Sequence, residues 1–308
     1  MLPKDKNQRL PVGRGISFVQ KFLPLLGLIL LVSQHSFAAS FDCGKASTKV
    51  ERMICMNPKL GESDQDLNDQ YTRLILASEP LKVAAIKTAQ RQWLKERGKC
   101  SDQICVQKVY QKRVRELYAQ LKKLRIYSAF NDEKEVVDEI LFSKFPSLRV
   151  LAKDAKPPPE DDAAWGVEFF IWERNPLYLV LRLSSWSHYK DAASMSADEE
   201  FVTLHMKEGT IVTENLLKST HDFSISNESL IRAAYLKHFE SRIGGCADLA
   251  KEEAMNITTT VPSRLGLGLM KSTSQVDAAC AGPFFITWSK VEQYLSETGL
   301  KVMKDFMN

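Results

Sequence analysis

Apolar residues recur at helical spacing in the stretch that follows residue 38, and this pattern predicts four helices. The first opens at the capping box Thr48-x-x-Glu51 and is broken by Asn57-Pro58. The other boundary signals are Ser63 or Asp64 at the start of the second helix, Pro80 and Gly98 at the ends of the third, and Ser101 at the start of the fourth. The pattern therefore predicts an all-helical module over residues 39–126.

The apolar stripes on these helices predict the core of the module. The second helix carries Leu67, Tyr71, Leu74 and Ile75, and the fourth carries Ile104, Val109, Leu117 and Leu121. The third helix carries Leu81, Ala84, Ala85, Ala89 and Trp93, so we expect these side chains to face inward. Trp93 is the largest of them and is expected to anchor the core rather than to bind a ligand.

The second half of the chain follows a different period. One more amphipathic helix is predicted over residues 132–143, and Pro157-Pro158-Pro159 among charged residues indicates a stiff linker or long loop. Beyond it, apolar residues alternate with polar ones, which is typical of strands. The predicted strands lie around 167–171, 178–182, 201–206, 257–261 and 284–288, with a hairpin near Asn175-Pro176 and a turn at Glu208-Gly209. Helices are predicted over 228–243 and after the cap Ser289-x-x-Glu292.

These elements predict a multidomain protein. An all-α, disulfide-stapled four-helix domain over residues 39–126 is followed by a helix and proline-rich linker over 127–164. Residues 165–308 then form an α+β domain, with an antiparallel sheet packed against two helices.

Residues 1–38 have the organisation of a secretory signal. Basic residues precede the apolar run from Phe22 to Val32, which is far shorter than the roughly 20 residues that a membrane-spanning helix needs. Small residues at positions 36 and 38 suit a signal peptidase, so we expect cleavage after Ala38. The prediction is export to the periplasm, with membrane contact only during export.

Charge divides the remaining chain into two unlike parts. Residues 39–126 hold 18 Lys/Arg and 10 Asp/Glu, whereas residues 127–308 hold 19 Lys/Arg and 27 Asp/Glu. Nucleic acid is not an expected partner, because no stacking aromatics interleave the basic residues. The asymmetry indicates attraction either between the two halves or between the acidic half and a cationic protein.

All six cysteines follow residue 38, and an even number in an oxidising compartment favours disulfides. Zinc is not expected, because the chain has no C-x-x-C pair and no H-x-x-x-H pair. We expect Cys100 and Cys105 each to pair with one of Cys43 and Cys55, in either crossing, and thereby to close loops of roughly fifty residues. Cys246 and Cys280 are then left to pair with each other.

The helical module carries an ordered motif. It begins with Phe41-Asp42-Cys43, Val50-Glu51-x-x-Ile54-Cys55 and Asp64-x-x-Leu67-x-x-x-Tyr71. It continues with Gln90-Arg91-x-Trp93-Leu94-x-x-Arg97-x-x-Cys100 and ends with Cys105, Tyr110, Arg113 and Leu117. This motif resembles the LprI family of lysozyme inhibitors over about residues 41–121. The resemblance implies a helical module of the cell envelope that binds lysozyme and blocks it.

The resemblance also says which residues define the motif besides the cysteines. They are Asp42, Glu51, Asp64, Tyr71, Gln90, Arg91, Trp93, Arg97, Tyr110 and Arg113, and we expect their role to be mainly structural. Arg91 and Arg97 are expected to be solvated or to pair with Asp64, Asp66 or Asp69. No motif position marks the inhibitory contact.

A second resemblance concerns residues 165–300. The order of strand, Glu-Gly-Thr turn, helix and final strand–helix step is similar to the extracellular domain of RsiV-type anti-sigma factors. That resemblance implies binding of lysozyme by this half too.

No constellation for catalysis or cofactor binding is found in the sequence. The four histidines beyond residue 38 lack metal-ligand spacing, and no Gly-x-Ser-x-Gly elbow, Walker loop or dinucleotide fingerprint occurs. We therefore expect no enzyme activity, no cofactor and no metal site.

These observations predict a lysozyme-binding inhibitor that acts by non-covalent occlusion of a lysozyme or another muramidase. The candidates for electrostatic steering are Asp161, Asp162, Glu199 and Glu200 in the acidic half. The positive charge of the helical module is at odds with lysozymes that are themselves cationic, unless contact there is mainly steric and apolar. The alternative is a non-inhibitory binding or scaffold module for envelope proteins or peptidoglycan.

Overall fold

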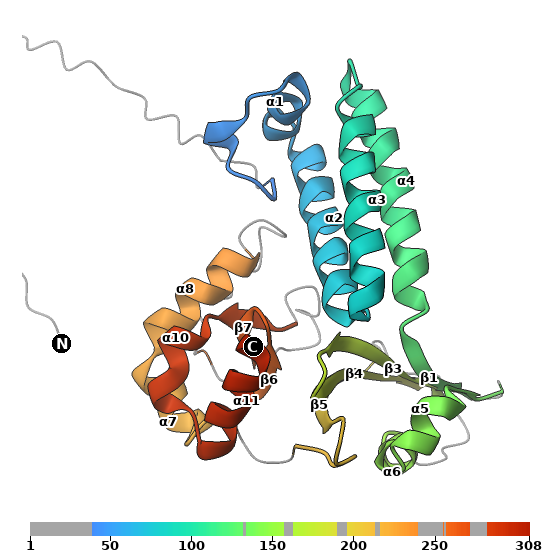
Figure 1. The fold of residues 1–308 in the computed structure, drawn as a ribbon, viewed down its shortest axis with the longest axis vertical. Helices are drawn as coiled ribbons and strands as arrows, with labels where there is room; N and C mark the ends of the chain where they lie inside the picture. The colour runs from blue at the N-terminus through green and yellow to red at the C-terminus, as the bar shows by residue number, and fades with distance from the viewer. Residues whose placement is uncertain are drawn as a thin grey trace, which may run out of the picture. The chain divides into compact units, whose positions relative to one another are not determined.

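The computed structural model describes residues 39–131, 134–156, 163–189, 196–212, 216–239, 255, 257–271 and 282–308 (Figure 1). These residues form a helical module, a five-stranded antiparallel sheet and a three-stranded antiparallel sheet with further helices. The predicted fold class, a disulfide-stapled helical part followed by an α+β part, is confirmed. The predicted signal over residues 1–38 lies outside the described residues.

Most helices of the helical module begin after capping residues that are visible in the sequence. Its elements are η1 (Cys43–Lys45), α1 (Lys49–Met56), α2 (Pro58–Ala77), α3 (Pro80–Arg97) and α4 (Gln103–Lys122). Thr48 and Glu51 make both hydrogen bonds of the predicted capping box. Helix α2 starts earlier than predicted, because Asn57 caps it and Pro58 fits its first turn. Helices α2, α3 and α4 run side by side (Figure 1).

The buried side of α3 differs from the prediction. Its inward positions are Ile86, Gln90, Trp93 and Arg97, which follow the spacing of one helix face. The outward positions include most of the side chains predicted to be buried, namely Leu81, Ala84, Ala85 and Ala89. Alanine is a poor guide to the buried face, because it has a high helix propensity at any position and its small side chain gains little free energy from burial. Trp93 is buried as predicted.

The two described disulfides join neighbours in sequence. Cys43 pairs with Cys55, and Cys100 pairs with Cys105, so the predicted pairing between the two ends of the module is wrong. Asp102 caps α4 between Cys100 and Cys105, and the turn there brings their Cα atoms to 5.4 Å. The predicted pair of Cys246 and Cys280 lies outside the described residues.

The larger sheet joins residues from both sides of the predicted linker. Its strands are β1 (Arg125–Phe130), β2 (Val136–Val137), β3 (Ala163–Arg174), β4 (Tyr178–Tyr189) and β5 (Ser196–His205), in the order β2-β1-β3-β4-β5. The predicted hairpin is confirmed, since the Asn175 side chain accepts hydrogen bonds from the backbone of Leu177 and Tyr178. The predicted turn is confirmed at Gly209, whose φ of +71° suits glycine.

Helices α5 (Glu139–Lys144) and α6 (Ser147–Asp154) cover one face of this sheet, where Phe142, Phe145 and Leu148 pack against β3 and β4 residues such as Phe169 and Leu181. The single helix predicted over residues 132–143 is not formed. Val136 and Val137 are β-branched and pair with β1, so helix α5 begins only at Glu139. Likewise, the predicted domain boundary at residue 126 falls within β1.

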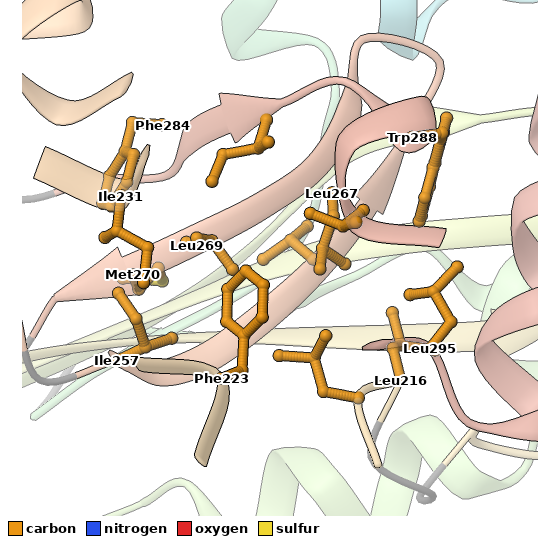
Figure 2. Packing of buried hydrophobic residues seen from close by; sticks show 14 of the residues in the cluster. Leu216, Phe223, Ile231, Ile257, Leu267, Leu269, Met270, Phe284, Trp288 and Leu295 are labelled. Atoms are coloured by element: carbon orange, nitrogen blue, oxygen red, sulfur yellow. The ribbon is translucent and has the colours of Figure 1, made fainter. Parts of the chain in front are cut away.

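The smaller sheet has its own core. Its strands are β6 (Ile257–Ser263), β7 (Gly266–Lys271) and β8 (Phe284–Ile286), and its helical elements are α7 (Thr220–Ser226), α8 (Glu228–Phe239), α10 (Trp288–Val291), η3 (Glu292–Tyr294) and α11 (Glu297–Met307). Figure 2 shows side chains from these elements converging, among them Phe223, Ile231, Leu269, Phe284 and Trp288. The single sheet predicted for this half is therefore two sheets.

The final helix starts later than predicted. Ser296, not Ser289, caps α11 by accepting a hydrogen bond from the Gly299 backbone at 3.0 Å. Ser289 and Glu292 instead belong to the short elements α10 and η3. Gly299 lies against the carbonyl of Leu216, where a Cβ would be only 2.0 Å from the oxygen, so this position requires glycine.

An ion pair between the buried Glu173 and the exposed Arg264 connects the helical module with both sheets. The Glu173 carboxylate on β3 is fully buried and accepts hydrogen bonds from the backbone and side chain of Arg264, both at 2.9 Å. Arg264 also donates to the backbone carbonyl of Leu76 at the end of α2, at 2.8 Å. One side chain from the turn between β6 and β7 therefore contacts all three parts of the fold.

Within the described ranges, none of the helices has the length and apolar character needed to span a membrane.

Candidate functional site

A groove of about 730 Å³ lies in the helical module, beside α2 and α3. Seven of the ten predicted motif residues line it, namely Glu51, Asp64, Tyr71, Gln90, Arg91, Trp93 and Arg97. The rest of its wall comes from Ser40, Phe41, Leu67, Asn68, Ala84, Lys87, Thr88 and Leu94. The structure thus brings together residues that are far apart in the sequence.

Asp64 and Arg97 in the wall of the groove belong to a buried polar network around Asp64 on α2. The Asp64 carboxylate accepts hydrogen bonds from the Tyr110 hydroxyl, from Arg97 Nη1 at 3.4 Å, and from the backbone and hydroxyl of Ser40 at 2.8 and 2.6 Å. Arg97 also donates to the Tyr110 hydroxyl at 2.8 Å. Burial, followed by the negative charge of Asp64, raises the pKa of Tyr110 above its usual range. Tyr110 therefore stays neutral and donates to Asp64.

Trp93 holds this network in place from α3. Its ring meets that of Tyr110 edge-to-face with 5.2 Å between the ring centroids, and the Arg97 guanidinium lies 5.4 Å from the Trp93 ring centroid. The indole N–H donates to the backbone carbonyl of Val109 on α4 at 3.4 Å. The predicted structural role of Trp93 agrees with this geometry.

Gln90 and Arg113 form a second buried contact between α3 and α4. Arg113 donates from Nε and Nη2 to the Gln90 side-chain oxygen, both at 3.1 Å, and from Nη1 to Glu116 at 3.1 Å. Since Arg113 is buried, Gln90 satisfies donors that would otherwise lack an acceptor. These two motif residues therefore hold α3 against α4.

The motif carboxylates at the N-terminal end act as caps. Asp42 accepts from the Gly44 backbone in η1, and Glu51 accepts from the Thr48 and Ser47 backbone at 2.9 Å each. Hydrogen bonds from these backbone groups, Thr48 first, lower the pKa of Glu51. Both residues cap the N-terminal end of the module.

The outward wall of the groove is a ridge on α3, which we call the α3 ridge and define as Ala84, Lys87, Arg91 and Leu94. All four side chains are exposed, and Leu94 is 41% exposed. Arg91 donates to Thr88 at 3.2 Å, and no carboxylate in the described part of the chain pairs with Lys87 or Arg91. Of the motif residues in the groove, Arg91 is therefore the one available to a partner as a charge.

The comparisons with known proteins bear on this module. Residues 42–117 match the family model described as "Lysozyme inhibitor LprI". The match spans about a quarter of the chain, and we call this segment the LprI-like module. LprI is a family of inhibitors rather than of enzymes. A search of curated proteins found no match to this chain.

Among solved structures, a DUF3298 family protein from Pseudomonas aeruginosa is similar over 56% of this chain and 93% of its own, with 10% identity and a TM-score of 0.37. The comparisons do not show the RsiV-type resemblance predicted for residues 165–300, which stays a prediction.

Polar side chains of the LprI-like module contact one another. Among the residues that the structure describes, no group of three or more His, Cys, Asp and Glu side chains is arranged to hold a metal ion. The acids of the network, such as Asp64, are occupied by internal hydrogen bonds.

Of the predicted steering residues, the structure describes Glu199 and Glu200. Glu199 on β5 is half-buried and pairs with Arg182 on β4, whereas the neighbouring Glu200 is exposed. Asp161 and Asp162 lie outside the described residues. The structure therefore leaves Glu200 as the one described steering candidate whose side chain is exposed.

Sequence reasoning missed Lys87 as a site residue. A signal was present, because Lys87, Arg91 and Lys95 recur every four residues and must share one side of a helix. The prediction placed Ala84 and Ala85 on the inward face of this helix, so the exposed position of Lys87 and Arg91 beside them was not recognised.

Proposed function

We propose that the LprI-like module binds a lysozyme and blocks its substrate cleft without covalent chemistry, in the periplasm after removal of residues 1–38. The observation that carries the proposal is the match of residues 42–117 to the lysozyme inhibitor family. The composition of residues 1–38, with a basic start and a short apolar run, supports export.

The α3 ridge is the part of the module best suited to enter a muramidase cleft. Such enzymes cleave glycosidic bonds with a pair of Asp or Glu residues that flank the scissile bond, so the centre of the cleft is acidic. Lys87 and Arg91 present two cations one helical turn apart, and Leu94 adds apolar surface beside them. This removes the conflict between a basic module and lysozymes of net positive charge, because the contact is with the local charge of the cleft.

The rigidity of the module supports the same mechanism. Trp93, Gln90 and Arg97 alternate with the ridge residues along α3 and are fixed by contacts to α2 and α4. A helix whose inner face is locked in this way holds its outer side chains in position before binding, which reduces the entropy lost on association.

The test is inhibition of cell-wall clearing by lysozymes of several types, with residues 39–308 titrated into the assay. We expect one type at least to be inhibited at stoichiometric binding. Unchanged clearing with every type would rule out inhibition and leave the alternative of a scaffold module.

A charge-reversal pair locates the contact. Lys87→Glu/Arg91→Glu should raise the half-inhibitory concentration at least ~10-fold, a loss of ~1.4 kcal/mol, because two like charges then face the acidic cleft. The matched control is Lys108→Glu/Lys112→Glu, which makes the same change at the same spacing on exposed positions of α4. Equal losses in both variants would show that net charge, and not the ridge, governs binding.

A further inference from the structure

A second cavity, of about 400 Å³, lies where the helical module meets the larger sheet. Four basic side chains from four elements line it, namely Arg73 on α2, Lys122 on α4, Arg125 on β1 and Arg182 on β4. Glu168 is the one acidic residue in its wall. The cavity is therefore strongly cationic and is separate from the groove beside the α3 ridge.

Two of these cations have carboxylate partners. Arg125 pairs with Glu168 at 2.8 Å, and Arg182 pairs with Glu199. For Arg73 and Lys122, by contrast, no carboxylate of the described residues lies within ion-pair distance; Arg73 lies over the ring of Trp172 and Lys122 over the ring of Tyr118. Two positive charges at this junction are thus left without a counter-charge from the described chain.

The arginines also have unused hydrogen-bond donors. The Nε–H groups of Arg73 and Arg182 are buried, and neither has an acceptor. A buried donor without an acceptor is unfavourable, and so is a buried cation beside another cation. Burial, together with the nearby charge of Arg182, lowers the pKa of Arg73 to about 10. Lys122, in the last turn of α4, is favoured there because cations are stabilised near helix C-termini.

We propose that this cavity binds a small oxyanion, a carboxylate or a phosphate, carried on a compact apolar group. Arg73 and Arg182 supply guanidinium groups, which match the geometry of both oxyanions, and Lys122 adds a cation at the rim. Phe170, Leu121 and the ring of Tyr118 provide the apolar part of the wall. The volume is near the lower limit for small-molecule sites, which excludes a polymer as the occupant of the cavity itself.

The site is made jointly by the helical module and the sheet, so its occupant would stabilise their contact. It goes beyond lysozyme inhibition, and its test does not depend on that proposal. Calorimetric titration and thermal unfolding of residues 39–308 are measured with phenyl phosphate, inorganic phosphate and benzoate, against chloride at equal ionic strength. We expect saturable binding and a raised unfolding temperature with phenyl phosphate, benzoate or both, and their ranking identifies the oxyanion.

Variants distinguish this site from general attraction of anions. Arg73→Gln should weaken binding at least tenfold, and Lys122→Gln, at an exposed position, should weaken it less while leaving the fold intact. Arg115→Gln, on an exposed position of α4, is the matched control and should bind as the unmodified chain does. The proposal is overturned if neither organic anion binds saturably, or if the Arg115 control loses as much affinity as both site variants.

Discussion

At the scale of single residues, the motif of the LprI-like module divides into two kinds of position. Asp64, Arg97 and Tyr110 are joined by hydrogen bonds to one another in one buried network. Arg91 comes from the same run of sequence but lies outside, on the α3 ridge. The motif therefore specifies the bundle chiefly through its buried members, and a binding role is open to Arg91.

Two substitutions should separate these roles. Asp64→Ala leaves Arg97 buried without its carboxylate partner, and we expect a loss of ~3–5 kcal/mol in the free energy of unfolding. Arg91→Ala removes an exposed side chain and should change stability by less than ~0.5 kcal/mol. Urea unfolding of residues 39–308 measures both, and a loss below ~1 kcal/mol for Asp64→Ala would contradict the structural role of the network.

The burial of single residues could be predicted from the sequence where the side chain's own chemistry decides it. It could not be predicted where burial depends on a partner from another element. Trp93 is a core anchor as expected, because a large aromatic side chain gains most from burial. The pairing of Arg97 with Asp64, one of the alternatives expected for this arginine, is found in the structure. The inward position of Gln90 was not foreseen, since a polar residue becomes buried only when a distant partner such as Arg113 is brought to it. Such partners become neighbours only in the folded structure.

At the scale of elements, the two disulfides of the described residues each close a short segment and do not link one helix of the bundle to another. Cys43–Cys55 spans 12 residues and Cys100–Cys105 spans 5. The crossed pairing expected from the sequence would have restricted the unfolded chain over much longer loops. The local pairing leaves the packing of α2, α3 and α4 to their side chains.

The disulfides should therefore contribute unequally. From the loop-length relation, replacing Cys43 and Cys55 by alanine should cost ~3 kcal/mol, and replacing Cys100 and Cys105 ~2 kcal/mol. Urea unfolding of the two double variants measures the difference. A loss above ~4 kcal/mol in the free energy of unfolding for the Cys100/Cys105 variant would show that this disulfide stabilises the protein by more than the closure of its own short loop.

At this scale, the alternating hydrophobic pattern predicted some strands and missed others. Alternation predicted β3 and β4 and the turn between them, because period two is hard to satisfy in any other way. It did not predict β1, which follows closely after α4, or β2, which has only two residues. Their pairing with β3 and with each other depends on tertiary contact, which the local sequence does not encode.

At the scale of the whole described molecule, three hydrophobic clusters must unfold, and each contains a buried tyrosine. Tyr110 lies in the helical module, Tyr127 under α5 and Tyr178 in the core of the smaller sheet. The hydrogen bonds of Arg264 with Glu173 and Leu76 join these regions. We therefore expect the three clusters to lose structure together.

Alkaline titration tests this coupling. Burial raises the pKa of Tyr110, Tyr127 and Tyr178 above the ordinary value of ~10, so the folded state holds these protons more tightly than the unfolded state. Their contribution to stability is complete below pH ~10 and falls as the pH rises above that value. Arg73 and Arg182 act in the opposite direction because burial lowers their pKa values, but they are two groups against three.

The measurement follows tyrosinate absorbance and backbone circular dichroism together from neutral to alkaline pH. Of the eight tyrosines, these three should ionise only as structure is lost, and in one transition. Tyr127→Phe removes one ionising group, so its stability should fall less steeply with pH than that of the unmodified chain. Three separate transitions would show that the ion pair of Glu173 and Arg264 does not couple the clusters, and complete ionisation with circular dichroism unchanged would contradict the burial of these hydroxyl groups.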